Sequence, residues 1–257
     1  MINFFRRTRQ RLVGNGRFSK YILYAIGEII LVVIGILIAL QINNRNEFQK
    51  TNTKQATYLA LIQNEMINNL KSLDEERLTL SKVILNQQIH LKLMQDKDAQ
   101  DTLSELHLSQ ILVNSISNDI SVNYENGVLT ELITSGNLKD ITNDSIRNKL
   151  SSWESKIYKI REQENSLSTY WNKSNDFFEA KGKFRTLFDH TTYSDYVELE
   201  RLDVNESNKS VLNSRVFENI LLIKLASSMH LEKGVYPKYK NEIEKLITMI
   251  EQELDSN

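Results

Sequence analysis

The most constraining feature of the sequence is the apolar segment 21–42, which reads YILYAIGEIILVVIGILIALQI. From Tyr21 to Leu40 its only charged side chain is Glu28. About twenty residues in an α-helix span roughly 30 Å, which is the thickness of the hydrocarbon core of a bilayer. The segment therefore predicts a transmembrane helix.

Two other interpretations of this apolar segment fit less well. A buried core helix of this length would need a large globular domain built around it, and no such domain flanks it. A cleavable signal peptide has an apolar region of about 7–15 residues and a cleavage site with small residues. The sequence Ala39-Leu40-Gln41 does not form such a site, so we expect a retained membrane span.

Charge is distributed unevenly along the chain. It has 32 basic and 33 acidic side chains and a net charge of -1. Six of the basic side chains but only one acidic one lie in residues 1–42, so the remainder carries 26 basic and 32 acidic groups. The positive-inside rule then predicts a cytoplasmic N-terminus, a single span of the inner membrane and a periplasmic body. An acidic body also argues against nucleic-acid binding, which needs a basic surface.

The basic residues of the tail have two possible roles, either as lipid contacts at anionic headgroups or as a topology signal alone. These residues are Arg6, Arg7, Arg9, Arg11, Arg17 and Lys20.

Residues that interrupt helices are scarce. The chain contains one proline, Pro237, and eight glycines, and neither type occurs between Gly35 and Gly127. This favours helices over strands and turns. We therefore expect an all-α protein with a basic cytoplasmic tail (1–20), one transmembrane helix (21–42) and one elongated helical-bundle domain outside the cytoplasm (43–257). The absence of cysteine excludes a disulfide scaffold.

Apolar residues recur at helical spacing after the span. We expect the helix to continue through the polar segment 43–57 and to fade in the polar run 96–101. Arg77 and Gln87 interrupt the apolar series. The series consists of Leu59, Ile62, Met66, Leu70, Leu73, Leu80, Ile84, Leu91 and Met94.

Capping signals predict the next helices. Thr102 and Glu105 form a capping-box pattern for a short helix that ends near Asn114, and 115–126 is expected to be a loop. A second short helix, 128–134, is expected to stop at Gly136.

Asn143-Asp144 is expected to cap a long helix with a core-facing apolar series, in which Glu164 and Ser174 also occupy seam positions. The apolar members are Ile146, Leu150, Trp153, Ile157, Ile160, Leu167, Trp171 and Phe178.

The last third of the chain begins with an irregular segment, 181–212, and ends with helix. A helix should start near Asn213, break or kink at Gly234 and Pro237, and then resume. Its first part places Val216, Ile220, Ile223, Ser227 and His230 on one face, and its second part has Ile243, Leu246, Ile250 and Leu254.

One face of the predicted span differs from the rest, because it carries a carboxyl group, phenols and small residues. Small residues let helices approach closely, and polar ones form hydrogen bonds between helices. Glu28 either serves such an interface or extends toward the cytoplasmic headgroups. The candidate interface consists of Tyr24, Glu28, Val32, Gly35 and Ala39.

Residues 17–47 read RFSKYILYAIGEIILVVIGILIALQINNRNE, and this segment resembles a family of uncharacterised single-pass membrane proteins common in Bacteroidota. Arg45 stands where that family often has tryptophan. The segment 135–150, SGNLKDITNDSIRNKL, resembles the family's SGxLxxIxNxxLRxxL pattern more loosely. The resemblance implies a location and an architecture but no chemistry.

No catalytic, metal-binding or cofactor-binding motif stands out. His90, His107, His190 and His230 lie on separate segments, and the sequence has no phosphate loop and no nucleophile elbow. We therefore expect no cofactor and no enzyme activity. Two functions stay open: a structural or interaction protein that binds a partner or forms a homo-oligomer through its membrane helix, and a ligand-sensing module that signals through a partner subunit.

Overall fold

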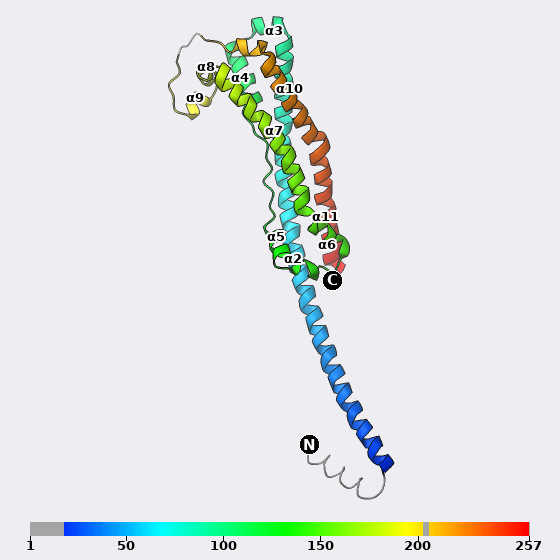
Figure 1. The fold of residues 1–257 in the computed structure, drawn as a ribbon. Coiled ribbons are helices and arrows are strands. Elements are labelled where there is room, and N and C mark those ends of the chain that lie inside the picture. Colours follow the sequence, from blue (N-terminus) through cyan, green and yellow to red (C-terminus); the bar gives the residue numbers. More distant parts are fainter. Residues whose placement is uncertain (1–17, 203–205, 257) are drawn as a thin grey trace. The chain divides into compact units, whose positions relative to one another are not determined.

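The computed structural model describes residues 18–202 and 206–256, and over these residues it contains helices and no strand (Figure 1). The predicted all-α fold is confirmed in this respect. The chain divides into two compact units, Met1–Ala56 and Thr57–Asn257, which are described separately below. The second unit is called the body here.

The helices follow one another as α2 (Phe18–Gln95), α3 (Lys97–Thr102), α4 (Glu105–Ile116), α5 (Gly127–Thr134), η1 (Asn137–Asp140), α6 (Asp144–Ser151), α7 (Trp153–Lys181), α8 (Phe184–Asp189), α9 (Tyr193–Tyr196), η2 (Lys209–Asn213), α10 (Arg215–His230), η3 (Leu231–Val235) and α11 (Tyr236–Ser256).

The first unit is built on the N-terminal part of α2, which is one unbroken helix of 78 residues from Phe18 to Gln95. The predicted continuation of the helix through 43–57 is thus confirmed. Glycine occurs in it only at Gly27 and Gly35, and proline does not occur. Every residue from 26 to 50 is exposed, apolar and polar ones alike.

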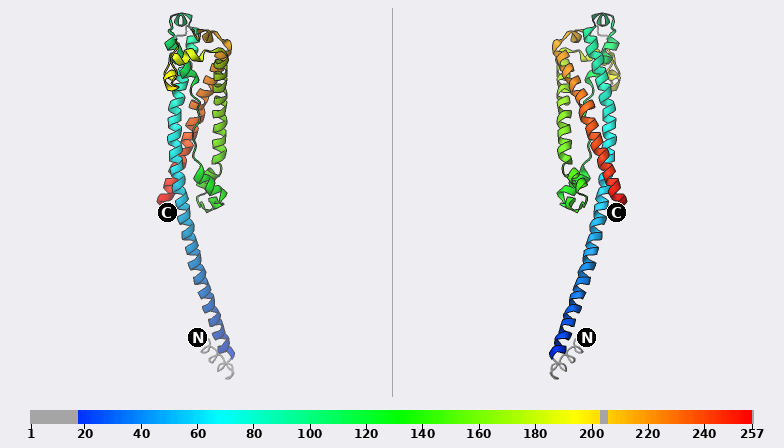
Figure 2. Two further views of the ribbon diagram at one scale, coloured as in Figure 1. Left: turned by 90° about the vertical axis from the view of Figure 1, so that its left-hand side faces the viewer. Right: turned by 90° about the vertical axis from the view of Figure 1, so that its right-hand side faces the viewer.

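In the body, the part of α2 after Thr57, α7 and the continuous α10–α11 helix run side by side, as both views of Figure 2 show. The body has two hydrophobic clusters. The larger one joins residues of α2, α5, α6, α7 and α11, and the smaller one joins residues of α4, α8 and α10 with the C-terminal end of α2. Burial of these apolar faces is the main stabilising contribution to such a bundle.

The two predicted apolar series form the core. On α2 all members are buried except Leu70 and Ile84, which are partly buried. On α6 and α7 all members are buried except Trp171, and the polar seam residues Glu164 and Ser174 are buried as well. The helical spacing in the sequence therefore identified the correct faces of these helices.

Three helix boundaries differ from the prediction. Thr102 does not cap a helix, because it ends α3 and its hydroxyl donates to the carbonyl oxygen of Asp98 at 3.2 Å. Ser104 caps α4 instead, accepting from the N–H of His107 at 3.3 Å. The helix does not simply fade in 96–101. It ends at Gln95, and Asp96 caps the new helix α3 by accepting from the N–H of Ala99 at 2.9 Å.

The long helix expected after Asn143 is interrupted at Ser152, which separates α6 from α7. The cap itself is confirmed, since the Asn143 side chain accepts from the N–H groups of Ser145 and Ile146 at 3.0 and 3.2 Å. The Ser152 hydroxyl donates back to the carbonyl oxygen of Asn148 at 3.1 Å. Serine hydroxyls that bond in this way compete with the helical pattern, which gives a local reason for the interruption.

On α10 the buried face is not the predicted one. Val216 and Ile223 are 61% and 45% exposed, whereas the neighbouring positions Phe217, Leu221 and Lys224 are buried. Phe217 stacks against Phe177 of α7 with ring centroids 4.7 Å apart. Because this large ring packs against α7, the helix face that contains Phe217 and Leu221 points into the core, and Lys224 on the same face is buried with them.

The helix does not break at Gly234 and Pro237. It widens into one π-helical turn, η3, and continues directly into α11. A π-turn contains one more residue than an α-turn, and it accommodates proline because a residue without an N–H group needs no acceptor in the helix.

Buried polar side chains hold the segment between α4 and α5 against α2. Asn69, which is fully buried, accepts from the N–H of Glu125 at 2.6 Å and donates to its carbonyl oxygen at 2.7 Å. Glu65 accepts from the N–H groups of Val128 and Leu129 at 2.9 and 3.3 Å. A carboxylate at the start of a helix supplies the acceptor that α5 lacks, because its own cap residue, Asn126, forms no side-chain hydrogen bond there.

Replacing Trp153 by alanine should destabilise the body by about 3–5 kcal/mol, because it empties a large, fully buried aromatic site. The measurement is the free energy of unfolding in urea, followed by circular dichroism. Tyr158→Ala on the same helix is the matched control, since Tyr158 is 64% exposed and its loss should change stability by less than about 0.5 kcal/mol. Equal losses in the two variants would contradict the core assignment.

Candidate functional site

The predicted intramembrane face lies on the first unit. Tyr24 is half-buried, and Glu28, Val32, Gly35 and Ala39 are exposed. Their spacing along one unbroken helix places them on the same side. A Cβ atom added to Gly35 would meet nothing within 4 Å, so space for a neighbouring helix is available there. Pairing of this face with another helix stays a prediction.

The predicted basic tail cannot be placed in the same way. Arg6, Arg7, Arg9, Arg11 and Arg17 lie outside the described residues. Lys20 belongs to α2, but its side chain is likewise outside the described part.

A cleft of about 510 Å³ lies in the body between α4 and the segment that joins α8 to α9. The sequence did not suggest it, because 181–212 showed no periodic pattern. The cleft is lined by Leu106, Gln110, Val113, Asn114, Asp189, His190, Thr191, Thr192, Tyr193 and Arg201.

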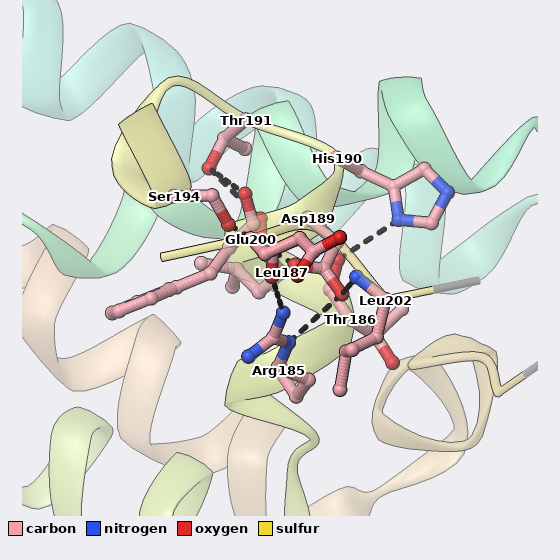
Figure 3. Close-up of polar contacts among 10 residues, drawn as sticks. Arg185, Thr186, Leu187, Asp189, His190, Thr191, Ser194, Glu200 and Leu202 are labelled. Atoms are coloured by element: carbon pink, nitrogen blue, oxygen red, sulfur yellow. Dashed lines mark hydrogen bonds and ion pairs between the residues drawn. The ribbon is translucent and has the colours of Figure 1, made fainter. Parts of the chain in front are cut away.

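Asp189 organises the α8–α9 segment beside this cleft (Figure 3). One carboxylate oxygen accepts from Arg185 Nε at 3.0 Å and from the N–H of Leu202 at 3.1 Å, and the other accepts from the Ser194 hydroxyl at 3.0 Å. Burial raises the pKa of Asp189, but the bonds from Arg185, Leu202 and Ser194 outweigh it, and the pKa is lowered. Because three donors stabilise its charged form, the Asp189 carboxylate is a weak base, and its hydrogen bonds hold this segment together.

His190 has a defined tautomer. Its Nδ1 lies 2.9 Å from the carbonyl oxygen of Thr186, and a carbonyl can only accept, so Nδ1 carries the proton. In Figure 3 the imidazole points away from the carboxylate of Asp189. The cleft therefore lacks the paired carboxylate and imidazole that acid–base catalysis commonly uses.

A second buried asparagine, Asn208, joins the two ends of the segment that contains α8 and α9. Asn208 accepts from the N–H of Lys183 at 2.7 Å and donates to its carbonyl oxygen at 3.1 Å. Glu105 at the start of α4 accepts from the N–H of Asn208 at 3.0 Å. These contacts join Lys183 and Asn208, which lie on either side of α8 and α9, to each other and to the start of α4.

A serine and a histidine meet in the core of the body, but not as a nucleophile and base. His90 Nδ1 lies 2.8 Å from Ser115 Oγ, and that hydroxyl donates to the carbonyl oxygen of Leu112 at 2.9 Å. The histidine is thus the donor in this pair, whereas catalysis would need the serine to donate. Both side chains are almost completely buried.

Lys224 lies in the same region and is 1% exposed. Its ammonium group donates to the carbonyl oxygen of Ser115 at 3.0 Å. Burial lowers the pKa of Lys224 to about 8, and burial together with the charge of Lys224 lowers the pKa of His90 to about 4. His90 is therefore neutral near pH 7. The predicted face of α10 did not include this lysine, although Lys224 lies at helical spacing from the buried residues Leu221 and Ser228.

Glu164 is the centre of a buried polar cluster in the larger core. Its Oε1 accepts from the hydroxyls of Tyr124 and Tyr236 at 2.8 and 2.9 Å. Burial raises the pKa of Glu164, and the two hydroxyls oppose this effect. Burial, together with the charge of Glu164, also raises the pKa values of both tyrosines. The seam position of Glu164 was visible in the sequence, but its partners come from other segments.

No group of three or more histidine, cysteine or acidic side chains could hold a metal ion within the residues that the structure describes. The buried clusters around His90 and Glu164 are enclosed by the bundle and stabilise it. The surfaces that remain for function are the predicted membrane face and the open clefts of the body.

Glu164 should make the stability of the body fall as pH rises. Its folded pKa is raised above the ordinary value, so between these two values the folded state binds more protons than the unfolded state. Glu164→Gln keeps an acceptor for both tyrosines and removes the titration. The free energy of unfolding of the wild type, relative to this variant, should therefore decrease from pH 4 to pH 8.

The control for this series is Glu162→Gln, which changes an exposed carboxyl two residues away on the same helix. Urea unfolding at each pH gives both differences. The Glu164→Gln difference should change with pH more than the control difference does. A flat difference for Glu164→Gln would show that Glu164 has the same pKa in the folded and unfolded states.

Comparison with known protein families gave a match. A family model described as "Family of unknown function (DUF6090)" matches residues 28–208, which include most of the apolar segment and the body up to Asn208. No curated protein and no solved structure gives a significant match. Because the family model covers more than half of the chain, the protein belongs to this family of unknown function, DUF6090.

Proposed function

We propose that this protein is a single-pass membrane protein of the cell envelope whose helical body binds a protein partner. The observation that carries the proposal is the apolar surface of α2, where a window with a mean hydropathy of 2.7 has none of its residues buried. Exposed apolar patches of this size are rare on proteins in water. In a bilayer the same side chains contact lipid, and the backbone groups of a helix are internally bonded.

The orientation of the span rests on charge. The tail 1–20 is basic, and the rest of the chain beyond residue 42 carries more acidic than basic groups. The positive-inside rule favours a cytoplasmic N-terminus, with the body in the periplasm if the cell is Gram-negative. The inner membrane is the compartment that this arrangement implies.

The hydrogen bonding and burial of the polar side chains in the body favour a binding role over a catalytic one. Asp189 is engaged by three donors, Ser115 donates away from His90, and Glu164 is enclosed by the bundle. These groups stabilise the fold and leave no activated nucleophile or base among themselves. The body then acts through its surface, as a scaffold or accessory subunit does.

A reporter fused after Asn257 tests the orientation. Alkaline phosphatase, which is active only outside the cytoplasm, should be active in this fusion, whereas a cytoplasm-active reporter at the same position should not. Replacing the arginines at 6, 7, 9 and 11 by glutamine removes much of the charge bias and should reduce the phosphatase signal. Activity of the cytoplasmic reporter alone would reverse the proposed topology.

We also expect the membrane helix to associate through the face that contains Glu28 and Gly35. Single cysteines at Ala39, on this face, and at Leu37, off it, are informative because the chain has no native cysteine. Crosslinking in membranes should be efficient at position 39 and weak at position 37. Glu28→Leu should weaken association by about 1–2 kcal/mol, and Gly35→Leu should block close approach. Equal crosslinking at both positions would contradict self-association through this face.

A second candidate function is ligand sensing through a partner subunit. It is favoured by an open groove of the body beside the π-turn η3, which has the size of a small-molecule site.

A further inference from the structure

A groove of about 630 Å³ runs between α7 and the segment formed by the end of α10, η3 and the start of α11. Small-molecule sites are commonly clefts of about 300–1,000 Å³ with apolar walls and a few polar groups. The groove has this make-up. Its lining includes Lys159, Ile160, Gly234, Lys238 and Tyr239.

The π-turn shapes one wall of the groove. It spans Leu231–Val235 and includes Gly234, which has no side chain to fill the space. A Cβ atom added at Gly234 would lie 3.5 Å from Nδ1 of His230, which is an ordinary contact, so a side chain at this position would lie beside His230. Single π-turns are often found at functional sites.

The rim of the groove carries an excess of positive charge. Glu242 lies 2.7 Å from Lys156 and 3.0 Å from Lys149, and the hydrogen bonds from Lys156 and Lys149 lower the pKa of Glu242 to about 2. Glu242 therefore offsets one of the two positive charges beside it. Lys159 and Lys238 have no acidic partner among the described residues, and Glu162 is the one other acidic lining residue there. Among the lining side chains, three lysines and two carboxylates leave an excess of one positive charge.

The floor of the groove is apolar and aromatic. Ile160 and Tyr239 are 6% and 3% exposed, and the Tyr239 ring packs against Trp153 with centroids 5.7 Å apart. The Tyr239 hydroxyl itself is buried, and burial raises its pKa, so it stays neutral. The floor therefore offers a ligand apolar and aromatic contact.

We propose that this groove binds a small amphipathic monoanion, with a carboxylate or phosphodiester head between Lys159 and Lys238 and an apolar portion over Ile160 and Tyr239. The unpaired lysines match one negative charge, and the aromatic floor matches a flat or branched apolar group. The ligand is either a free small molecule or the head region of an anionic lipid. The proposal names a ligand class for the second candidate function, and it holds for either orientation of the chain in a membrane.

The test uses the full-length protein in nanodiscs of zwitterionic lipid, where both faces are accessible, with empty nanodiscs as the blank. Calorimetry measures binding of 2-naphthoate and of its uncharged analogue, 2-naphthamide. Naphthoate should bind with an affinity about tenfold higher or more, because a charge-assisted hydrogen bond contributes about 1.5–3 kcal/mol. No heat of binding for naphthoate, or equal affinities of the two probes, would overturn the proposal.

Variants assign the site. Lys159→Glu with Lys238→Glu should reduce naphthoate affinity at least about tenfold, and Gly234→Leu should reduce the affinity for both probes. The matched control is Lys173→Glu with Lys245→Glu, which makes the same charge changes on the same two helices outside the groove. If the control lowers affinity equally, the effect is one of net charge and the site is wrong.

Two further arms complete the design. Should the glutamate pair fail to fold by circular dichroism, Lys159→Gln with Lys238→Gln removes the charges more mildly and should still lower naphthoate affinity. Nanodiscs that contain anionic lipid distinguish the ligand sources. Competition with naphthoate there would identify a lipid head as the ligand, and unchanged affinity would identify a free anion.

Discussion

The apolar seam that α2 shares with α7 and α11 is the constraint on which the rest of the body depends. Leu59, Ile62 and Met66 of α2 belong to the same buried cluster as Trp153 and Ile243. Interiors of proteins are close-packed, so the large side chains of one helix determine where the next can lie. Once these long helices pack against one another, the shorter helices have defined surfaces on which to pack.

Buried polar side chains then place the segments that are not helical. Asn69 and Asn208 each bond to both the N–H and the carbonyl of one backbone residue, as a neighbouring strand would. A buried backbone group without a partner costs about 1–3 kcal/mol, so such contacts stabilise one path of the chain strongly over others. The cleft beside α8 and α9 adjoins the segment that Asn208 anchors in this way.

The same apolar residue types act differently in the two units. In the body they form a core covered by polar faces, and in the first unit they are exposed over the whole circumference of the helix. An amphipathic helix indicates packing against protein, and a uniformly apolar one indicates lipid as its surroundings. Function is accordingly expected at surfaces, namely the face around Glu28 and the groove beside η3.

The sequence by itself determined the all-helical fold, the long apolar segment and the core faces of α2 and α7. These depend on local hydrogen bonds and on a 3.6-residue spacing that can be recognised within a short window. Tertiary structure alone decided which face of α10 is buried, where Glu164 finds Tyr124 and Tyr236, and how the groove beside Gly234 opens. In each of these cases the contacts join residues far apart in the chain. Their free energies depend on burial and on partners from other helices, which a local pattern does not contain.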